Sequence, residues 1–185
     1  MVYKEIIVDA DFCIKLGSSE KYRYLEKILP LLSEKVYVHE TVNEEIKTPR
    51  GQINALLASG KITVLTESSL NEQEQKVYAA TFAKLAKVML DKSSPNKNRG
   101  EVCSLAMAKV KEIPCFVTDE SNLQPIIDSN LNTGMNDITC VRVIDIVGLI
   151  KDGKLPDLAR KDAKIIWIIA GKDKAVFDHE IWPIS

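Results

Sequence analysis

Acidic side chains stand at the ends of two apolar stretches of the chain, in "IIVDAD" and in "CFVTDE". Asp9 follows the first stretch directly, Asp11 lies two residues further on, and Asp119 ends the second stretch. If the two stretches are neighbouring parallel strands, their carboxylates face one crevice at the carboxyl ends of the sheet. Two bare carboxylates side by side repel each other unless a cation lies between them. Because oxygen ligands favour hard cations, the pair indicates a Mg²⁺ or Mn²⁺ site.

Two glutamates on adjoining helical segments could complete such a site. In "TVNEEIK", Val42 and Ile46 lie one helical turn apart and should face the core. Glu45 then lies on the flank of that face, whereas Glu44 points to the opposite side. Glu101 stands in the first turn of the helical segment that precedes the second acidic stretch, which leaves it near one edge of the sheet.

Each of these acids also has an ordinary structural interpretation. Asp9, Asp11 and Asp119 could cap the helices that follow them. Glu101 could complement a helix dipole, and Glu45 could lie on a solvated face. Acids at two strand ends together with acids on adjoining helices are hard to obtain from capping alone. We therefore predict that they share one cation.

The elements that must position these acids alternate along the chain. Runs of β-forming residues lie at 5–9, 35–39, 61–65, 114–119 and 139–144, with helical patterns between them. This alternation predicts an α/β fold with three layers, α/β/α, around a central, mostly parallel five-stranded sheet. We expect one compact domain over residues 1–155. A C-terminal helical extension, residues 156–185, should pack on the same domain.

Composition narrows the function classes further. The chain has 185 residues and a net charge of −1, so no overall field draws it to nucleic acid or to an anionic membrane. No apolar run approaches the roughly 20 residues that span a bilayer, and the first residues lack signal-peptide architecture. We therefore expect a cytoplasmic protein with no membrane partner. The four cysteines are scattered and there are two histidines, which predicts reduced buried thiols and argues against a zinc site.

Four stretches of the chain together resemble the PIN domain, a family of metal-dependent nucleases. They are "IIVDADFCIKLG", "VYVHETVNEEI", "RGEVCSLAMAKVKEIPCFVTDESNLQ" and "CVRVIDIVGLIKDGKL", and they are spread over roughly residues 6–155. Each motif is short, and it is their order and spacing that carries the resemblance. By motif, the four acids of the family fall on Asp9, Glu45, Glu101 and Asp119, and Glu120 matches a position that is often a further acid.

Three departures from the family pattern leave these acids in place. Asp11 stands where the family commonly has Asn, and His39 stands where a proline is common. The segment 68–99 is longer than in the smallest members.

The resemblance implies hydrolysis of RNA by one or two Mg²⁺ or Mn²⁺ ions held by the carboxylates. The metal ligands would be Asp9, Glu45, Glu101, Asp119 and Glu120. Basic residues near these acids are predicted to contact substrate phosphates, namely Lys47, Arg50, Lys92, Lys97 and Arg99. Because the family includes toxin–antitoxin ribonucleases, an antitoxin protein is a candidate partner. The apolar tail would also allow a homodimer.

Two other interpretations of the sequence stay open. "DADFC" resembles the opening of haloacid-dehalogenase-like phosphatases, in which Asp9 would be the nucleophile and Asp11 the general acid. That interpretation leaves Glu45 and Glu101 without a role. The second alternative is an RNA-binding module that keeps the nuclease fold with weak or no activity.

Overall fold

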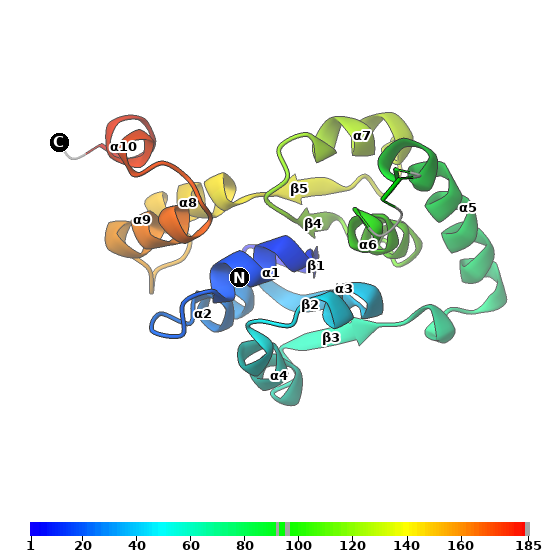
Figure 1. Cartoon of the computed structure of the whole chain (residues 1–185), viewed down its shortest axis with the longest axis horizontal. Coiled ribbons are helices and arrows are strands. Elements are labelled where there is room, and N and C mark those ends of the chain that lie inside the picture. The colour runs from blue at the N-terminus through cyan, green and yellow to red at the C-terminus, as the bar shows by residue number, and fades with distance from the viewer. Residues whose placement is uncertain (92, 95–96, 184–185) are drawn as a thin grey trace.

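Five parallel strands form the centre of the computed structural model, which describes residues 1–91, 93–94 and 97–183 (Figure 1). The sheet has the order β3-β2-β1-β4-β5, and every pairing between neighbours is parallel. The predicted α/β class, with its central five-stranded sheet, is confirmed. The strands are β1 (Tyr3–Val8), β2 (Ser33–His39), β3 (Ile62–Leu65), β4 (Cys115–Val117) and β5 (Thr139–Val141).

Helices follow each strand and cover both faces of the sheet (Figure 1). The longer ones are α1 (Ala10–Gly17), α2 (Tyr24–Leu32), α4 (Arg50–Ala58), α5 (Glu72–Met89), α6 (Arg99–Val110), α7 (Leu123–Asn130), α8 (Val143–Lys151) and α9 (Arg160–Ile169). The shorter segments are α3 (Glu40–Glu45), the 3₁₀ turn Glu67–Ser69, α10 (Lys174–Val176) and a π-type turn, Phe177–Ile181.

Alternate residues of β1 divide the interior into two cores. Ile6 and Val8 belong to the core under α1, α2, α8 and α9, whereas Ile7 belongs to the core under α5, α6 and α7. This follows from the two-residue period of a strand, which sends neighbouring side chains to opposite faces. All three side chains are fully buried, as expected for the central strand of a sheet covered on both faces. The three-layer arrangement predicted from the sequence is confirmed.

The point where the strand order reverses lies between β1 and β4. From β1 the chain moves outward through β2 to β3, and β4 then returns to the other side of β1 (Figure 1). Val8 is paired with Val117, and the Asp9 N–H donates to the Val117 carbonyl oxygen at 2.9 Å. The two acidic stretches identified in the sequence therefore leave the sheet side by side, in the crevice where ligands of such folds bind.

The fifth strand is shorter than predicted. It ends at Val141, and α8 already begins at Val143. The start of the helix is fixed by the Asp145 carboxylate, which accepts a hydrogen bond from the Arg142 N–H at 2.8 Å. An acidic residue near a helix N-terminus is a common start signal, and here it shortens an apolar run that resembled a longer strand.

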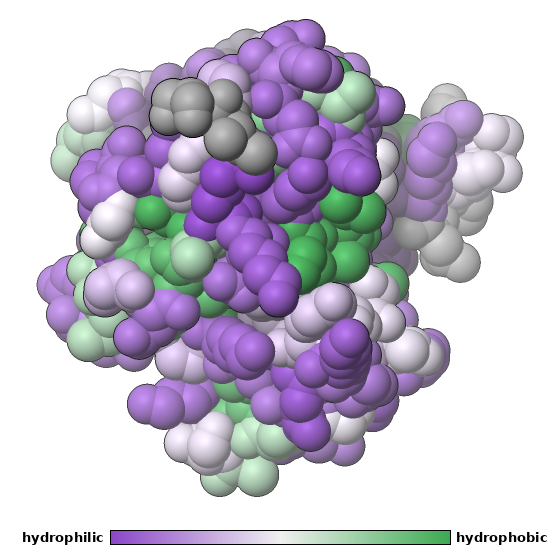
Figure 2. Space-filling model, turned by 90° about the vertical axis from the view of Figure 1, so that its left-hand side faces the viewer, coloured by the Kyte–Doolittle hydropathy of each residue, from purple (hydrophilic) through white to green (hydrophobic). Residues whose placement is uncertain are grey.

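The C-terminal helices complete one of the two cores. Ala163, Ile166 and Trp167 of α9, together with Phe177, are buried in the core that contains Ile6 and Val8. At this end of the molecule, apolar residues gather in a band that a hydrophilic segment interrupts (Figure 2). Within the described part of the chain, none of the helices combines the length and the apolar character that crossing a membrane requires.

Candidate metal centre

Asp9 lies at the exit of β1 with its carboxylate buried. Oδ1 accepts a hydrogen bond from the Ala10 N–H at 2.7 Å, and the Thr118 hydroxyl donates to Oδ2 at 3.4 Å. Asp9 therefore does act as a helix cap, as the structural interpretation of the sequence anticipated. Its surroundings are nevertheless unfavourable for a charge, because the residue is only 1% exposed.

Glu101, in the first turn of α6, is the residue toward which the other acids converge. After burial, the charge of Glu101 is the main factor that raises the pKa of Asp9, and the same holds for Glu45. Burial raises the pKa of Glu101 itself, and the charges of Glu120 and Asp11 raise it further. We call the five residues the acid centre: Asp9, Asp11, Glu45, Glu101 and Glu120.

The electrostatics of the acid centre favour a cation. Burial and the charge of Glu101 raise the pKa of Asp9 to about 8, although the hydrogen bond from Ala10 opposes this rise. The carboxylates do not form a tight cluster, because no three members of the acid centre, all within the described residues, bring their oxygens within 4.8 Å of one another. A divalent ion would remove this repulsion, and the oxygen donors suit Mg²⁺ or Mn²⁺.

A glycine makes room for one member of the acid centre. Glu45 ends α3, and a Cβ added to Gly100 would lie 2.7 Å from Glu45 Oε2 and 3.1 Å from Val42 Cγ2. The absence of a side chain at Gly100 therefore lets the Glu45 carboxylate rest against the first turn of α6. The sequence signal for this contact is a glycine directly before an acid in a helical pattern.

Asp119 lies in different surroundings from those expected. Its side chain is 4% exposed, with Oδ2 lying 3.3 Å from Lys15 Nζ and Oδ1 lying 3.1 Å from Lys172 Nζ. Lys15 also contacts Asp11 at 2.6 Å, so it links Asp119 to the margin of the acid centre. The acid that faces Glu101 from the exit of β4 is the next residue, Glu120. Of the acids predicted from the sequence as ligands, Asp119 is therefore the one already held by two ammonium groups.

Exchanging Asp119 for Asn should destabilise the fold. The change leaves two ammonium groups without their shared, nearly buried carboxylate, which should cost about 1–3 kcal/mol. For a chain of this size, that corresponds to a fall in Tm of roughly 3–9 °C in a thermal melt. As a control, Asp152→Asn breaks only an exposed pair with Lys154 at 3.9 Å and should leave Tm nearly unchanged. An Asp119→Asn protein that melts with the wild type would show that the two lysines do not depend on this carboxylate.

The basic residues proposed for substrate contact differ in how far they are already engaged. Arg50 donates from Nη1 to the Asn43 carbonyl at 2.7 Å and to Asn43 Oδ1 at 3.0 Å. Lys47 and Arg50 line a separate recess together with Asn43 and Glu44. Lys97 and Arg99 are exposed at the start of α6, close in sequence to Glu101. Of the predicted set, these two stay the better candidates for phosphate contact. Lys92 lies outside the described residues.

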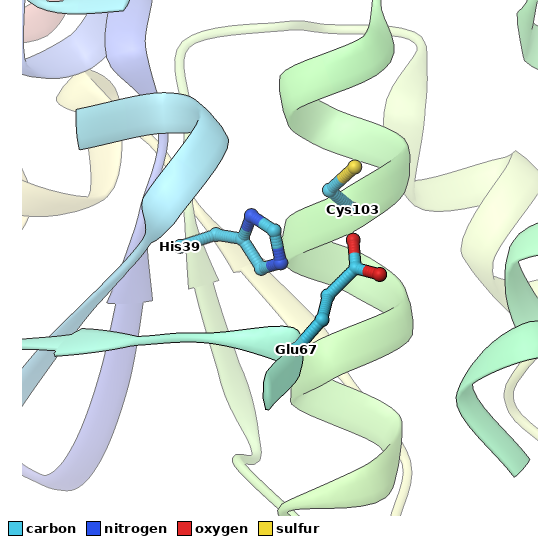
Figure 3. A group of neighbouring side chains, drawn as sticks. All are labelled: His39, Glu67 and Cys103. Carbon is cyan, nitrogen blue, oxygen red and sulfur yellow. The ribbon is translucent and has the colours of Figure 1, made fainter. Parts of the chain in front are cut away.

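A second cluster, which the sequence analysis did not anticipate, joins His39, Glu67 and Cys103 (Figure 3). One ligand atom from each lies within 4.8 Å of the others. The Thr41 N–H, however, donates to His39 Nδ1 at 3.1 Å, so the ring proton belongs on Nε2, which faces the Tyr78 hydroxyl at 3.3 Å. A metal on Nε2 would need this proton moved and the bond from Thr41 broken.

The other members of this cluster also behave as parts of a hydrogen-bonded network. Tyr78 donates to Glu67 Oε1 at 2.8 Å, and burial both lowers the pKa of His39 and raises that of Cys103. A neutral imidazole and a protonated thiol need no cation between them. We therefore interpret the cluster as a structural link between the ends of β2 and β3 and helices α5 and α6.

Comparison with known proteins identified no relative of this chain. The chain matches none of the protein-family models against which it was compared, and none of the curated proteins.

Proposed function

We propose that the chain is a metal-dependent ribonuclease, with Mg²⁺ or Mn²⁺ held by the acid centre. The observation that carries the proposal is geometric: Asp9 leaves β1 beside β4, and Glu45 rests against the first turn of α6, which contains Glu101, at the point where the strand order reverses. The sequence resemblance to PIN domains supports hydrolysis of RNA as the reaction.

The ligand set follows from the position of each acid. Asp9, Glu45, Glu101 and Glu120 would hold the ion, because each is electrostatically coupled to the others through Glu101. Such an ion supplies an acidified water and offsets charge on a phosphate under attack. Asp11 accepts from Lys15 at 2.6 Å and so keeps that ammonium at the margin of the centre. Lys15 can therefore orient the outer carboxylates and a phosphate without entering the ligand set.

A test compares two neighbouring glutamates of α3. The purified wild type should cut a labelled single-stranded RNA with Mn²⁺ or Mg²⁺, and EDTA should stop the reaction. Glu45→Gln should lower the rate by at least about 100-fold, since a lost metal ligand costs no less than a lost supporting residue. Glu44→Gln is the matched control, because Glu44 is exposed like Glu45 but lies outside the acid centre. Its rate should equal that of the wild type.

The same assay separates the alternatives. Release of phosphate from a small phosphoester, with RNA left intact, would indicate the phosphatase that uses Asp9 and Asp11. Retention of RNA without cutting at any metal concentration would indicate a binding module. Either result would overturn the nuclease proposal. An antitoxin partner and a homodimer formed through the apolar end of the molecule are further proposals that rest on the resemblance alone.

A further inference from the structure

A cavity of about 190 Å³ lies against one side of the acid centre. Two of its lining residues, Glu101 and Glu120, belong to the acid centre. The remaining lining residues come from the end of α5, from α7, and from the residues that directly precede α6 and α7. They are Val88, Met89, Asn98, Asn122, Leu123 and Ile126. The cavity and the metal centre therefore share a wall.

The lining is partly apolar and partly polar. Val88 and Met89 of α5 and Leu123 and Ile126 of α7 are its apolar walls, and we call the polar lining residues the rim: Asn98, Glu101, Glu120 and Asn122. Asn98 donates from Nδ2 to the Met89 carbonyl at 3.1 Å, which fixes its amide plane and makes Oδ1 the acceptor it can offer. Both carboxylates stand on the side that adjoins the acid centre.

The volume of the cavity limits the size of the ligand that it can hold. Pockets for drug-sized ligands usually measure roughly 300–1,000 Å³, so this cavity is too small for a whole nucleotide. It is large enough for one flat heterocycle. Proteins that take up an extruded base hold the ring faces between apolar side chains and bind its edge through hydrogen bonds. Aliphatic walls with amides at the rim provide both kinds of contact.

We propose that this cavity binds one unpaired nucleobase of an RNA strand whose phosphate lies at the acid centre. The inference rests on the proposed nuclease function, and it adds the form of the substrate. Because Glu101 and Glu120 border both sites, the base and the phosphate would belong to the same or to adjacent nucleotides. A base held in this cavity cannot stay paired in a duplex. The substrate must therefore be single-stranded at the cut.

The experiment measures base dependence separately from cutting. Short labelled RNAs, each with one nucleotide replaced by an abasic residue, are titrated against the wild-type protein with Ca²⁺, which the same oxygen ligands can hold, and affinity is read from fluorescence anisotropy. The same RNAs are then given to the wild type with Mn²⁺, and the cut is mapped. We expect one abasic position, next to the cut, to weaken binding by about 10-fold or more, while the others change it little.

Two variants locate the effect. The double variant Val88→Gln, Asn122→Ala alters an apolar wall and the rim at two exposed positions, and it should remove the difference between intact and abasic RNA. Val77→Gln is the control, because Val77 is 43% exposed on the same helix and does not line the cavity. It should keep the full difference.

Each outcome bears on one proposal. Equal affinity for all the RNAs, or no binding at all, overturns the base site whether or not the wild type cuts. A base preference that survives in the double variant also overturns it, because the base then binds elsewhere. A preference that the double variant removes, without any cutting by the wild type, keeps the base site and rejects the nuclease. Cutting by the wild type without a base preference keeps the nuclease and rejects the base site.

Discussion

Asp9→Asn should make the protein more stable while it removes metal binding. Asp9 is buried beside Glu101 with its pKa raised to about 8, so ionising it costs the folded state free energy that the unfolded chain does not lose. From a shift of about 4 pH units, this cost is at most about 4 kcal/mol at pH 7. Even half of it would raise Tm by roughly 4–8 °C. Asn keeps the shape of the side chain and can still accept the hydrogen bond from Ala10.

The stability gained by Asp9→Asn should depend on pH, because the pKa of Asp9 is raised in the folded state. Between about pH 4 and pH 8 the unfolded state has lost the Asp9 proton and the folded state has kept it, so wild-type stability falls as pH rises. The gain from Asp9→Asn should therefore be small near pH 4 and largest near pH 8. Chemical denaturation at these two pH values measures it. Mn²⁺ should raise the Tm of the wild type and leave that of the variant unchanged. A variant less stable than the wild type at pH 8 would contradict this account.

Gly100→Ala should weaken metal binding without destabilising the fold. The added Cβ would lie 2.7 Å from Glu45 Oε2, which is the end of a flexible side chain, so the carboxylate can swing away at little cost. The Cβ would also lie 3.1 Å from Cγ2 of the buried Val42, which must give by a few tenths of an ångström. Because alanine is the better helix former by about 1 kcal/mol, this gain should offset the crowding, and we expect a nearly unchanged Tm without metal. The concentration of Mn²⁺ needed to stabilise the protein should rise by about 10–100-fold, as for other residues that position metal ligands.

Gly51 offers a closely matched control for this variant. It is the second residue of α4 and follows Arg50, just as Gly100 is the second residue of α6 and follows Arg99. A Cβ at Gly51 would meet no atom within 4 Å. Gly51→Ala should therefore give the helix-propensity gain alone. If the two alanine variants require the same Mn²⁺ concentration as the wild type, the close approach of Glu45 to α6 has no part in metal binding.

The fold could be predicted from the sequence because its strands are separated by clear helical patterns. Strand-like and helix-like hydrophobic periods alternate along the chain, and each is a local property of the sequence. This alternation is enough to predict the fold class, the three layers and the parallel sheet. The end of β5 could not be predicted, because "TCVRVI" continues as an apolar run and only the backbone hydrogen bond made by Asp145 decides where the helix begins.

The candidate site was predictable where helical periodicity determines the direction of a side chain. Val42 and Ile46 are both buried, and between them Glu45 reaches the acid centre, as their spacing indicates. At the exit of β4 the pattern fails. Asp119 and Glu120 are adjacent acids outside any repeat, so periodicity could not indicate that Asp119 pairs with Lys172, which lies far along the chain.

The contact between Lys172 and Asp119 has a consequence for how the chain is divided. Residues 156–185 follow the last stretch that resembles a nuclease, so the resemblance alone places a truncation at residue 155. Such a cut would delete one of the two cations that neutralise Asp119, directly beside the residue that faces Glu101. The tail thus supplies a counterion to Asp119, and a shortened protein that keeps this contact has to extend at least to Lys172.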